Sequence, residues 1–141
     1  GSAGDRDRDK RPVMGAIAAR AADVVIVTDD TPHSEDPAPI RAHILAGARA
    51  EADRIAREEG RTVVIEEVAD RAAAIRRAVE LAGPQDGILL AGRGHETTMD
   101  YDGELVPLDD RVALREALAA RVAAASASGS GPAREGKVIE S

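Results

Sequence analysis

The sequence predicts an α/β fold: a Rossmann-like three-layer sandwich with a mostly parallel sheet and a late antiparallel hairpin. Short runs of valine, isoleucine and leucine alternate along the chain with longer alanine-rich stretches of helical periodicity. The apolar runs lack polar alternation, which is typical of strands buried on both faces. A length of 141 residues fits one domain of this kind.

The chain opens with a loop, a helix and a strand. Residues 1–11 combine glycine with dense charge and predict a loop. Pro12 favours the first turn of a helix, which we expect over residues 13–22. Residues 24–27 (VVIV) form a continuous apolar run and predict the first buried strand.

A second helix and strand follow a polar turn. Asp36 and Pro37 suit the cap and first turn of a helix, and two helical stretches come after them, the second ending at Gly60. Residues 62–65 (TVVI) are mostly β-branched and predict the second strand. Alternation of this kind connects parallel strands through helices.

The third helix and strand have the same order. We expect Asp70 to cap a helix that runs to Ala82, where Gly83 and Pro84 end it. Residues 88–91 (ILLA) then predict a third buried strand.

The last segment predicts a hairpin and a helix. Residues 99–108 contain Asp102-Gly103, a favoured two-residue turn between antiparallel strands. Asp109 opens the final helix. The apolar residues of this helix include Val112, Leu114, Leu118 and Val122.

The domain is expected to cover residues 1–125 and to lack a first strand that lies upstream of Gly1. Residues 126–141 are rich in serine, glycine and charge and predict a disordered tail.

Composition narrows the classes of function. A net charge of −7 and a single aromatic residue, Tyr101, argue against nucleic acid and anionic membrane as partners. The absence of cysteine excludes disulfides and thiolate zinc sites, and the histidines lie too far from other ligands to predict a metal site. No apolar run is as long as a membrane span. We therefore expect a cytoplasmic, monomeric protein.

Three polar loops are expected at the carboxyl edge of the sheet, where ligands bind in this class of fold. Residues 4–11 (GDRDRDKR) offer arginines to a carboxylate or phosphate, or are a solvated charge run. Residues 28–37 (TDDTPHSEDP) offer carboxylates to an ammonium group or a magnesium ion, or are a capped turn. Residues 92–97 (GRGHET) let the backbone approach a ligand, or are a tight turn. Together the loops predict a pocket for a charged, amine-bearing small molecule.

Several motifs in these loops resemble those of a known family. In order, the chain contains GDRD, KRP, TDD-x-P, SEDP and GHE, followed by LDDR before the last helix. This combination resembles the Mur ligase family over roughly residues 3–122, and most resembles the members that add a diamino acid to UDP-N-acetylmuramoyl-L-alanyl-D-glutamate in peptidoglycan synthesis. The resemblance implies a Rossmann-like carboxy-terminal domain with a six-stranded sheet. Such a domain presents the amino acid to a central domain that binds ATP and Mg²⁺.

The resemblance also implies roles for individual residues. Arg6 would contact the carboxylate of the amino acid, while Gly92 and Glu96 would line the far side of the pocket, with Glu96 placed for the distal amine. The four-residue specificity motif would be Asp30, Thr31, Pro32 and His33. No catalytic residue is expected here, so we predict that this chain alone is inactive.

The specificity motif departs from the family pattern. Members that use meso-diaminopimelate usually read Asp-Asn-Pro-Arg, whereas residues 30–33 read Asp-Thr-Pro-His. An arginine fork grips the second carboxylate of diaminopimelate, and a mostly neutral histidine cannot. Losing such a contact costs about 1.5–3 kcal/mol. The sequence therefore favours L-lysine as substrate, then ornithine, with meso-diaminopimelate third.

The alternative is a stand-alone Rossmann-like module that binds a small molecule without catalysis. This alternative predicts a complete sheet within the chain. The ligase interpretation instead predicts a strand immediately before Gly1 and ATP-binding sequence before that strand.

Overall fold

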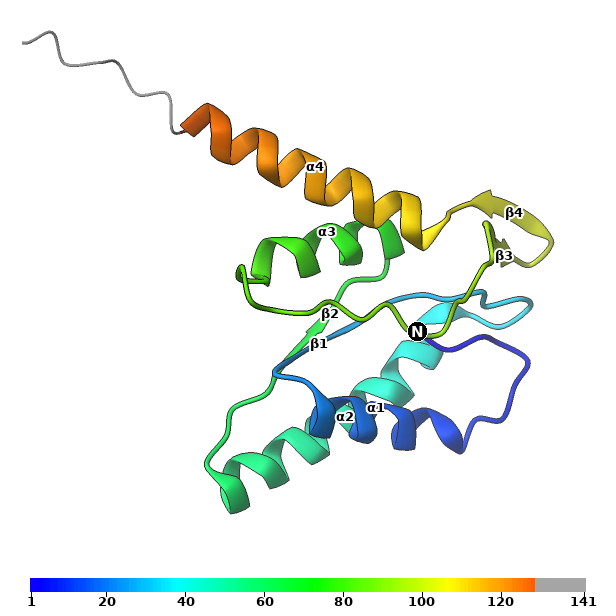
Figure 1. Ribbon diagram of the computed structural model, residues 1–141. Helices are drawn as coiled ribbons and strands as arrows, with labels where there is room; N and C mark the ends of the chain where they lie inside the picture. Colours follow the sequence, from blue (N-terminus) through cyan, green and yellow to red (C-terminus); the bar gives the residue numbers. More distant parts are fainter. Residues whose placement is uncertain (129–141) are drawn as a thin grey trace, which may run out of the picture.

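The computed structural model describes residues 1–128 as helices packed on both sides of a small parallel sheet, with a separate hairpin (Figure 1). The elements, in order, are α1 (Lys10–Ala21), β1 (Val24–Val27), α2 (Pro37–Glu59), β2 (Val64–Glu67), α3 (Arg71–Leu81), β3 (Thr98–Tyr101), β4 (Glu104–Pro107) and α4 (Asp110–Ser128). In Figure 1, α1 and α2 lie below β1 and β2, and α3 and α4 lie above them. The predicted α/β class is thus confirmed, with a smaller parallel sheet than expected.

Local sequence signals fix most element ends. The Asp36 carboxylate accepts from the Ala38 amide at 2.9 Å with Pro37 in the first turn of α2, and Gly60 ends that helix at φ +66°. The Asp70 carboxylate caps α3 by accepting from the Ala73 amide at 2.6 Å. The two helical stretches expected between Asp36 and Gly60 form one continuous helix.

The sheet consists of β1 and β2, paired in parallel with Val24 opposite Val64 and Val27 opposite Glu67. The second strand therefore begins two residues later than predicted. The predicted hairpin is confirmed: β3 and β4 are antiparallel, and Asp102 and Gly103 have φ values of +54° and +87°. Positive φ at both turn residues matches the twist of the flanking strands.

The predicted third strand at residues 88–91 is wrong. This segment has no regular secondary structure, and Leu89 is 88% exposed. Ile88 and Leu90 pack against an apolar cluster between α3 and α4. An apolar run becomes a strand only where a neighbouring backbone can pair with it, and within residues 1–128 none lies alongside this one.

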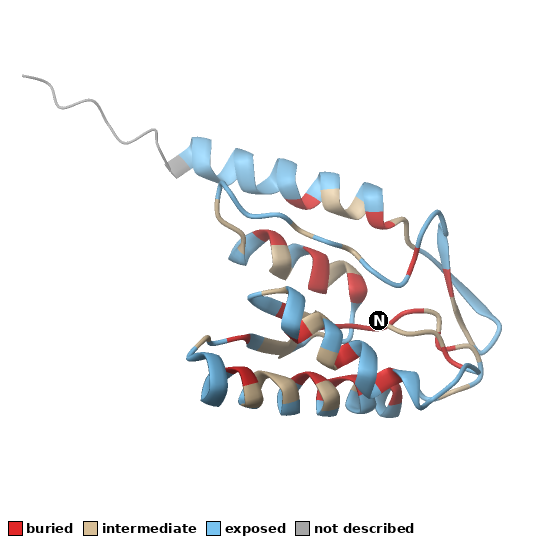
Figure 2. Ribbon diagram, turned by 60° about the horizontal axis from the view of Figure 1, so that its bottom comes forward, coloured by how far each residue is buried: buried red, intermediate tan, exposed pale blue. Residues whose placement is uncertain are grey.

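The predicted last helix is confirmed as α4. Val112, Leu118 and Val122 are exposed, whereas Ala117 is buried. Most of α4 is exposed in Figure 2. The helix also extends beyond residue 125: residues 126–128, predicted to belong to a disordered tail, are the last residues of α4. Residues 129–141 of the predicted tail lie outside the described residues. No helix within residues 1–128 is both long and apolar enough to cross a membrane.

Candidate functional site

The three polar loops meet beyond the carboxyl end of β1. The Gly4 amide donates to the Thr31 carbonyl at 2.9 Å, and a Cβ on Gly4 would lie 1.7 Å from the Pro32 carbonyl oxygen. A Cβ on Gly92 would lie 2.7 Å from an Asp30 carboxylate oxygen, and Gly92 has φ +100°. Both glycines are therefore required for contact between the loops.

Glu35 fixes the first loop against the second. Its carboxylate accepts from the buried Arg11 guanidinium at 2.9 and 3.1 Å and from the Asp5 amide at 2.7 Å. The hydrogen bonds from Arg11 lower the pKa of Glu35 to about 2, so it stays ionised at neutral pH. The Ser34 hydroxyl donates to Asp5 at 3.0 Å in the same place. The charged opening segment is thus anchored at Gly4 and Arg11, while residues 5–10 between them are exposed to solvent.

Two carboxylates follow β1 in succession, and both are buried. Asp29 accepts from Arg41 and from the Tyr101 hydroxyl at 3.3 Å. Burial, with Asp29 nearby, raises the pKa of Tyr101 to about 12, so this hydroxyl remains a donor. Asp30 is 6% exposed, and its carboxylate accepts from the Thr31 amide at 2.8 Å.

Arg6 and Glu96 are exposed, in contrast to Asp30. Within residues 1–128, Arg6 makes no hydrogen bond or ion pair, which leaves its guanidinium free for a ligand. The Glu96 carboxylate accepts from the Gly94 amide at 2.7 Å. Hydrogen bonds from the Glu96 and Gly94 amides lower the pKa of Glu96, so it carries a negative charge at neutral pH.

The remaining residues of the specificity motif are held by their surroundings. Pro32 is fully buried, and Thr31 is half-buried with its carbonyl bound to Gly4. His33 has φ +52° and joins the hairpin: its amide donates to the Asp100 carbonyl at 3.1 Å, and its carbonyl accepts from the Asp102 amide at 2.7 Å. Its Nδ1 lies 3.1 Å from an Asp100 carboxylate oxygen, and this contact lowers the pKa of Asp100.

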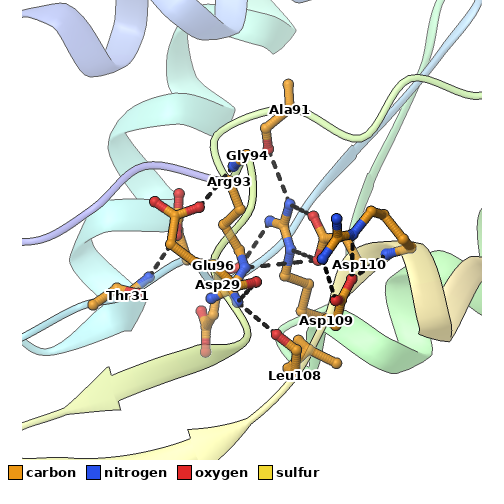
Figure 3. A network of polar contacts seen from close by, with 12 residues as sticks. Asp29, Thr31, Ala91, Arg93, Gly94, Glu96, Leu108, Asp109 and Asp110 are labelled. Atoms are coloured by element: carbon orange, nitrogen blue, oxygen red, sulfur yellow. Dashed lines mark hydrogen bonds and ion pairs between the residues drawn. The ribbon is translucent and has the colours of Figure 1, made fainter.

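A buried ionic network lies behind these loops (Figure 3). Arg71 donates to both carboxylate oxygens of Asp110 at 2.8 and 2.7 Å, and Arg93 Nε lies 3.7 Å from the same carboxylate. The side chains of Arg71, Arg93 and Asp110 are 3%, 1% and 7% exposed. Sequence reasoning missed Arg71 and Asp110, because each reads as an ordinary charged residue in the first turn of a helix. It also missed Asp100, which only the pairing of His33 with the hairpin brings to the site.

Comparison with known proteins identifies the family. Residues 1–94 match the family described as "Mur ligase, glutamate ligase domain". The chain belongs to the Mur ligase family. The sequence resemblance is therefore confirmed.

Individual relatives agree with this assignment. The chain is 52% identical over 118 residues to a UDP-N-acetylmuramoyl-L-alanyl-D-glutamate--2,6-diaminopimelate ligase of Corynebacterium efficiens, covering 84% of this chain and 22% of that protein. It is 50% identical over 123 residues to the ligase of the same name from Bradyrhizobium diazoefficiens, covering 87% of this chain and 22% of the relative. A solved structure of a ligase with this name superposes with a TM-score of 0.69 at 36% identity, covering 86% of this chain and 23% of that one. The chain thus spans about a fifth of the length of these relatives.

Proposed function

We propose that this chain is the carboxy-terminal domain of an ATP-dependent ligase that adds a diamino acid to UDP-N-acetylmuramoyl-L-alanyl-D-glutamate. The carrying observation is that three loops in mutual contact bring an unpaired Arg6, the buried carboxylate of Asp30 and the exposed, ionised Glu96 to one edge of the sheet. A diamino acid presents the complementary groups, one carboxylate and two ammonium groups. The names of the relatives support the same reaction.

Each residue has a defined part in this proposal. The Arg6 guanidinium pairs with the carboxylate of the amino acid, and Glu96 binds the distal ammonium group. Asp30 adds a carboxylate on the neighbouring loop, in close contact with Gly92. The protein thereby orients the attacking amine toward an activated carboxyl group of the second substrate, and orientation of this kind lowers the entropic part of the barrier.

The remaining chemistry is assigned to other parts of the whole protein. ATP and Mg²⁺ serve to activate the carboxyl group as an acyl phosphate. Within residues 1–128 no group of three metal-ligating side chains comes together, and the sequence has no Gly-Lys-Ser/Thr phosphate loop. The residues described here do not fit either cofactor, so we expect the chain alone to be inactive. The resemblance to one fifth of a longer ligase favours this proposal over a stand-alone binding module.

For the diamino acid itself we propose L-lysine, with ornithine second. The Nδ1 atom of His33 already contacts Asp100, so the ring cannot offer a second substrate carboxylate the two-nitrogen fork of an arginine. The ionised Asp100 carboxylate beside it repels such a group and attracts an ammonium group. The second candidate is 2,6-diaminopimelate, which the names of the relatives favour.

Turnover of the full-length protein with L-lysine, L-ornithine and meso-diaminopimelate tests this proposal. We expect the highest kcat/KM with L-lysine. In His33→Arg, the ratio of kcat/KM for meso-diaminopimelate to that for L-lysine should rise about tenfold or more, since a bidentate arginine contact is gained. Preference of the unmodified enzyme for meso-diaminopimelate would contradict the lysine assignment. Turnover with none of the three would contradict the ligase proposal.

We also propose that a parallel strand precedes Gly1 in the whole protein and pairs with the free edge of β1. Gly1 lies between the two segments that such a strand would join: a Cβ there would be 2.9 Å from the Thr28 carbonyl, and its own carbonyl lies against Gly92.

A further inference from the structure

We propose that Arg71, Arg93 and Asp110 are positioning residues that set the separation of Asp30 and Glu96 and thereby the affinity for the diamino acid. This inference rests on the proposed function. None of the three side chains is exposed enough to touch the substrate, so any effect they have on binding is transmitted through the loops that they hold.

Arg71 joins three segments through a single guanidinium group. Its Nη1 donates to the Asp29 carbonyl at 3.2 Å, one residue before Asp30, and its Nη2 donates to the Ala91 carbonyl at 3.1 Å, one residue before Gly92. Its Nε and Nη2 bind the Asp110 carboxylate at the start of α4. One planar group therefore fixes the starts of both loops relative to each other and to a helix end.

Arg93 fixes the far end of the third polar loop, residues 92–97. Its Nη2 donates to the Glu96 carbonyl at 3.1 Å and to the Leu108 carbonyl at 2.7 Å, which closes the loop and ties it to the end of the hairpin (Figure 3). Its Nε faces Asp110, while Nε and Nη1 have no hydrogen-bond partner within residues 1–128. The backbone position of Glu96 thus depends directly on this guanidinium.

Asp110 couples the two arginines. Its carboxylate is the one acidic partner that both guanidinium groups share within the described residues. Lysine cannot replace either arginine in this role, because a single ammonium group lacks the planar fork that reaches several acceptors at once. An arginine-to-lysine change therefore keeps the charge and the ion pair while removing the geometry.

The decisive experiment compares Arg71→Lys with Arg77→Lys in the full-length protein. Arg77 lies on the same helix and binds Glu66 through two bonds of 2.9 Å, with no polar contact to the three loops, so it serves as a control. We expect Arg71→Lys to raise the KM for the diamino acid about ten- to a hundredfold, with the KM for ATP and kcat nearly unchanged. Arg77→Lys should leave all three constants unchanged.

Hydrogen exchange provides a readout that does not need turnover. In Arg71→Lys, the amides of residues 29–31 and 92–96 should exchange faster. In Arg93→Lys, only the amides of residues 92–96 should exchange faster. Arg93→Lys also serves as the second variant if Arg71→Lys fails to fold. An unchanged KM for the diamino acid, or a fall in kcat at constant KM, would overturn the inference. If the unmodified protein uses no diamino acid, the proposed function fails, and unchanged exchange in both loops would then overturn the positioning role as well.

Discussion

The two sides of the sheet are stabilised in different ways. On the side of α1 and α2, one continuous apolar cluster joins helices and strands, with Ile55 fully buried at its centre. On the side of α3 and α4, the buried apolar cluster is limited to Ile75, Val79 and Ala117. Buried charge in the Arg71–Asp110–Arg93 network adds to the contacts that join this side to the rest of the molecule. The half with the weaker core thus depends on buried charge, and the same charge positions the candidate site.

Among the changes that test this difference between the two sides, removing the carboxylate that Arg71 and Arg93 share should have the largest effect on stability. Asp110→Ala leaves two buried guanidinium groups without their acidic partner, which we expect to lower the free energy of unfolding by about 3–5 kcal/mol. Chemical denaturation of this chain measures the change. Arg111→Ala, which removes an exposed ion pair with Asp109 on the same helix, should leave the unfolding free energy almost unchanged. Equal effects of the two substitutions would remove the distinction between the halves.

Adding the proposed upstream strand should have a smaller, local effect. The backbone carbonyls of Asp23 and Val27 accept hydrogen bonds from Val64 and Val68, so the backbone groups of odd-numbered residues in β1 point toward β2. The backbone amide of Ile26 therefore points toward the free edge of β1. When the chain is extended at its amino terminus by the preceding segment of the natural protein, hydrogen exchange at the Ile26 amide should slow by about tenfold or more. The Val27 amide, already facing β2, serves as the internal control. Unchanged exchange at Ile26 would contradict the strand.

The sequence predicted those parts of the fold that depend on local chemistry. Asp36, Asp70 and Gly60 act at helix ends through bonds to their own neighbours, and Asp102-Gly103 forms its turn for the same reason. Residues 88–91 failed as a strand because strand formation depends on a partner distant in sequence or outside this chain. The apolar side chains of residues 88–91 indicate only that the segment is suited to burial.

The candidate site shows the same division. Its loops could be predicted, because polar motifs follow apolar runs at the sheet edge. The network behind them could not, because Arg71 and Asp110 are 39 residues apart and neither position is unusual for a charged residue. His33 could be recognised as a departure from the motif, but its pairing with Asp100 depends on how the hairpin folds back.

The central claim is that the three loops bind the amino acid, and Arg6 tests it most directly. Arg6 has no partner within residues 1–128, so its removal should not disturb the fold. In the full-length protein, Arg6→Ala should raise the KM for the diamino acid about tenfold or more, with an unchanged KM for ATP, because a charge-assisted contact to the carboxylate is lost. Arg8→Ala, two residues away and paired loosely with Glu35 at 3.4 Å, should have little effect. An unchanged KM for the diamino acid in Arg6→Ala would contradict the account.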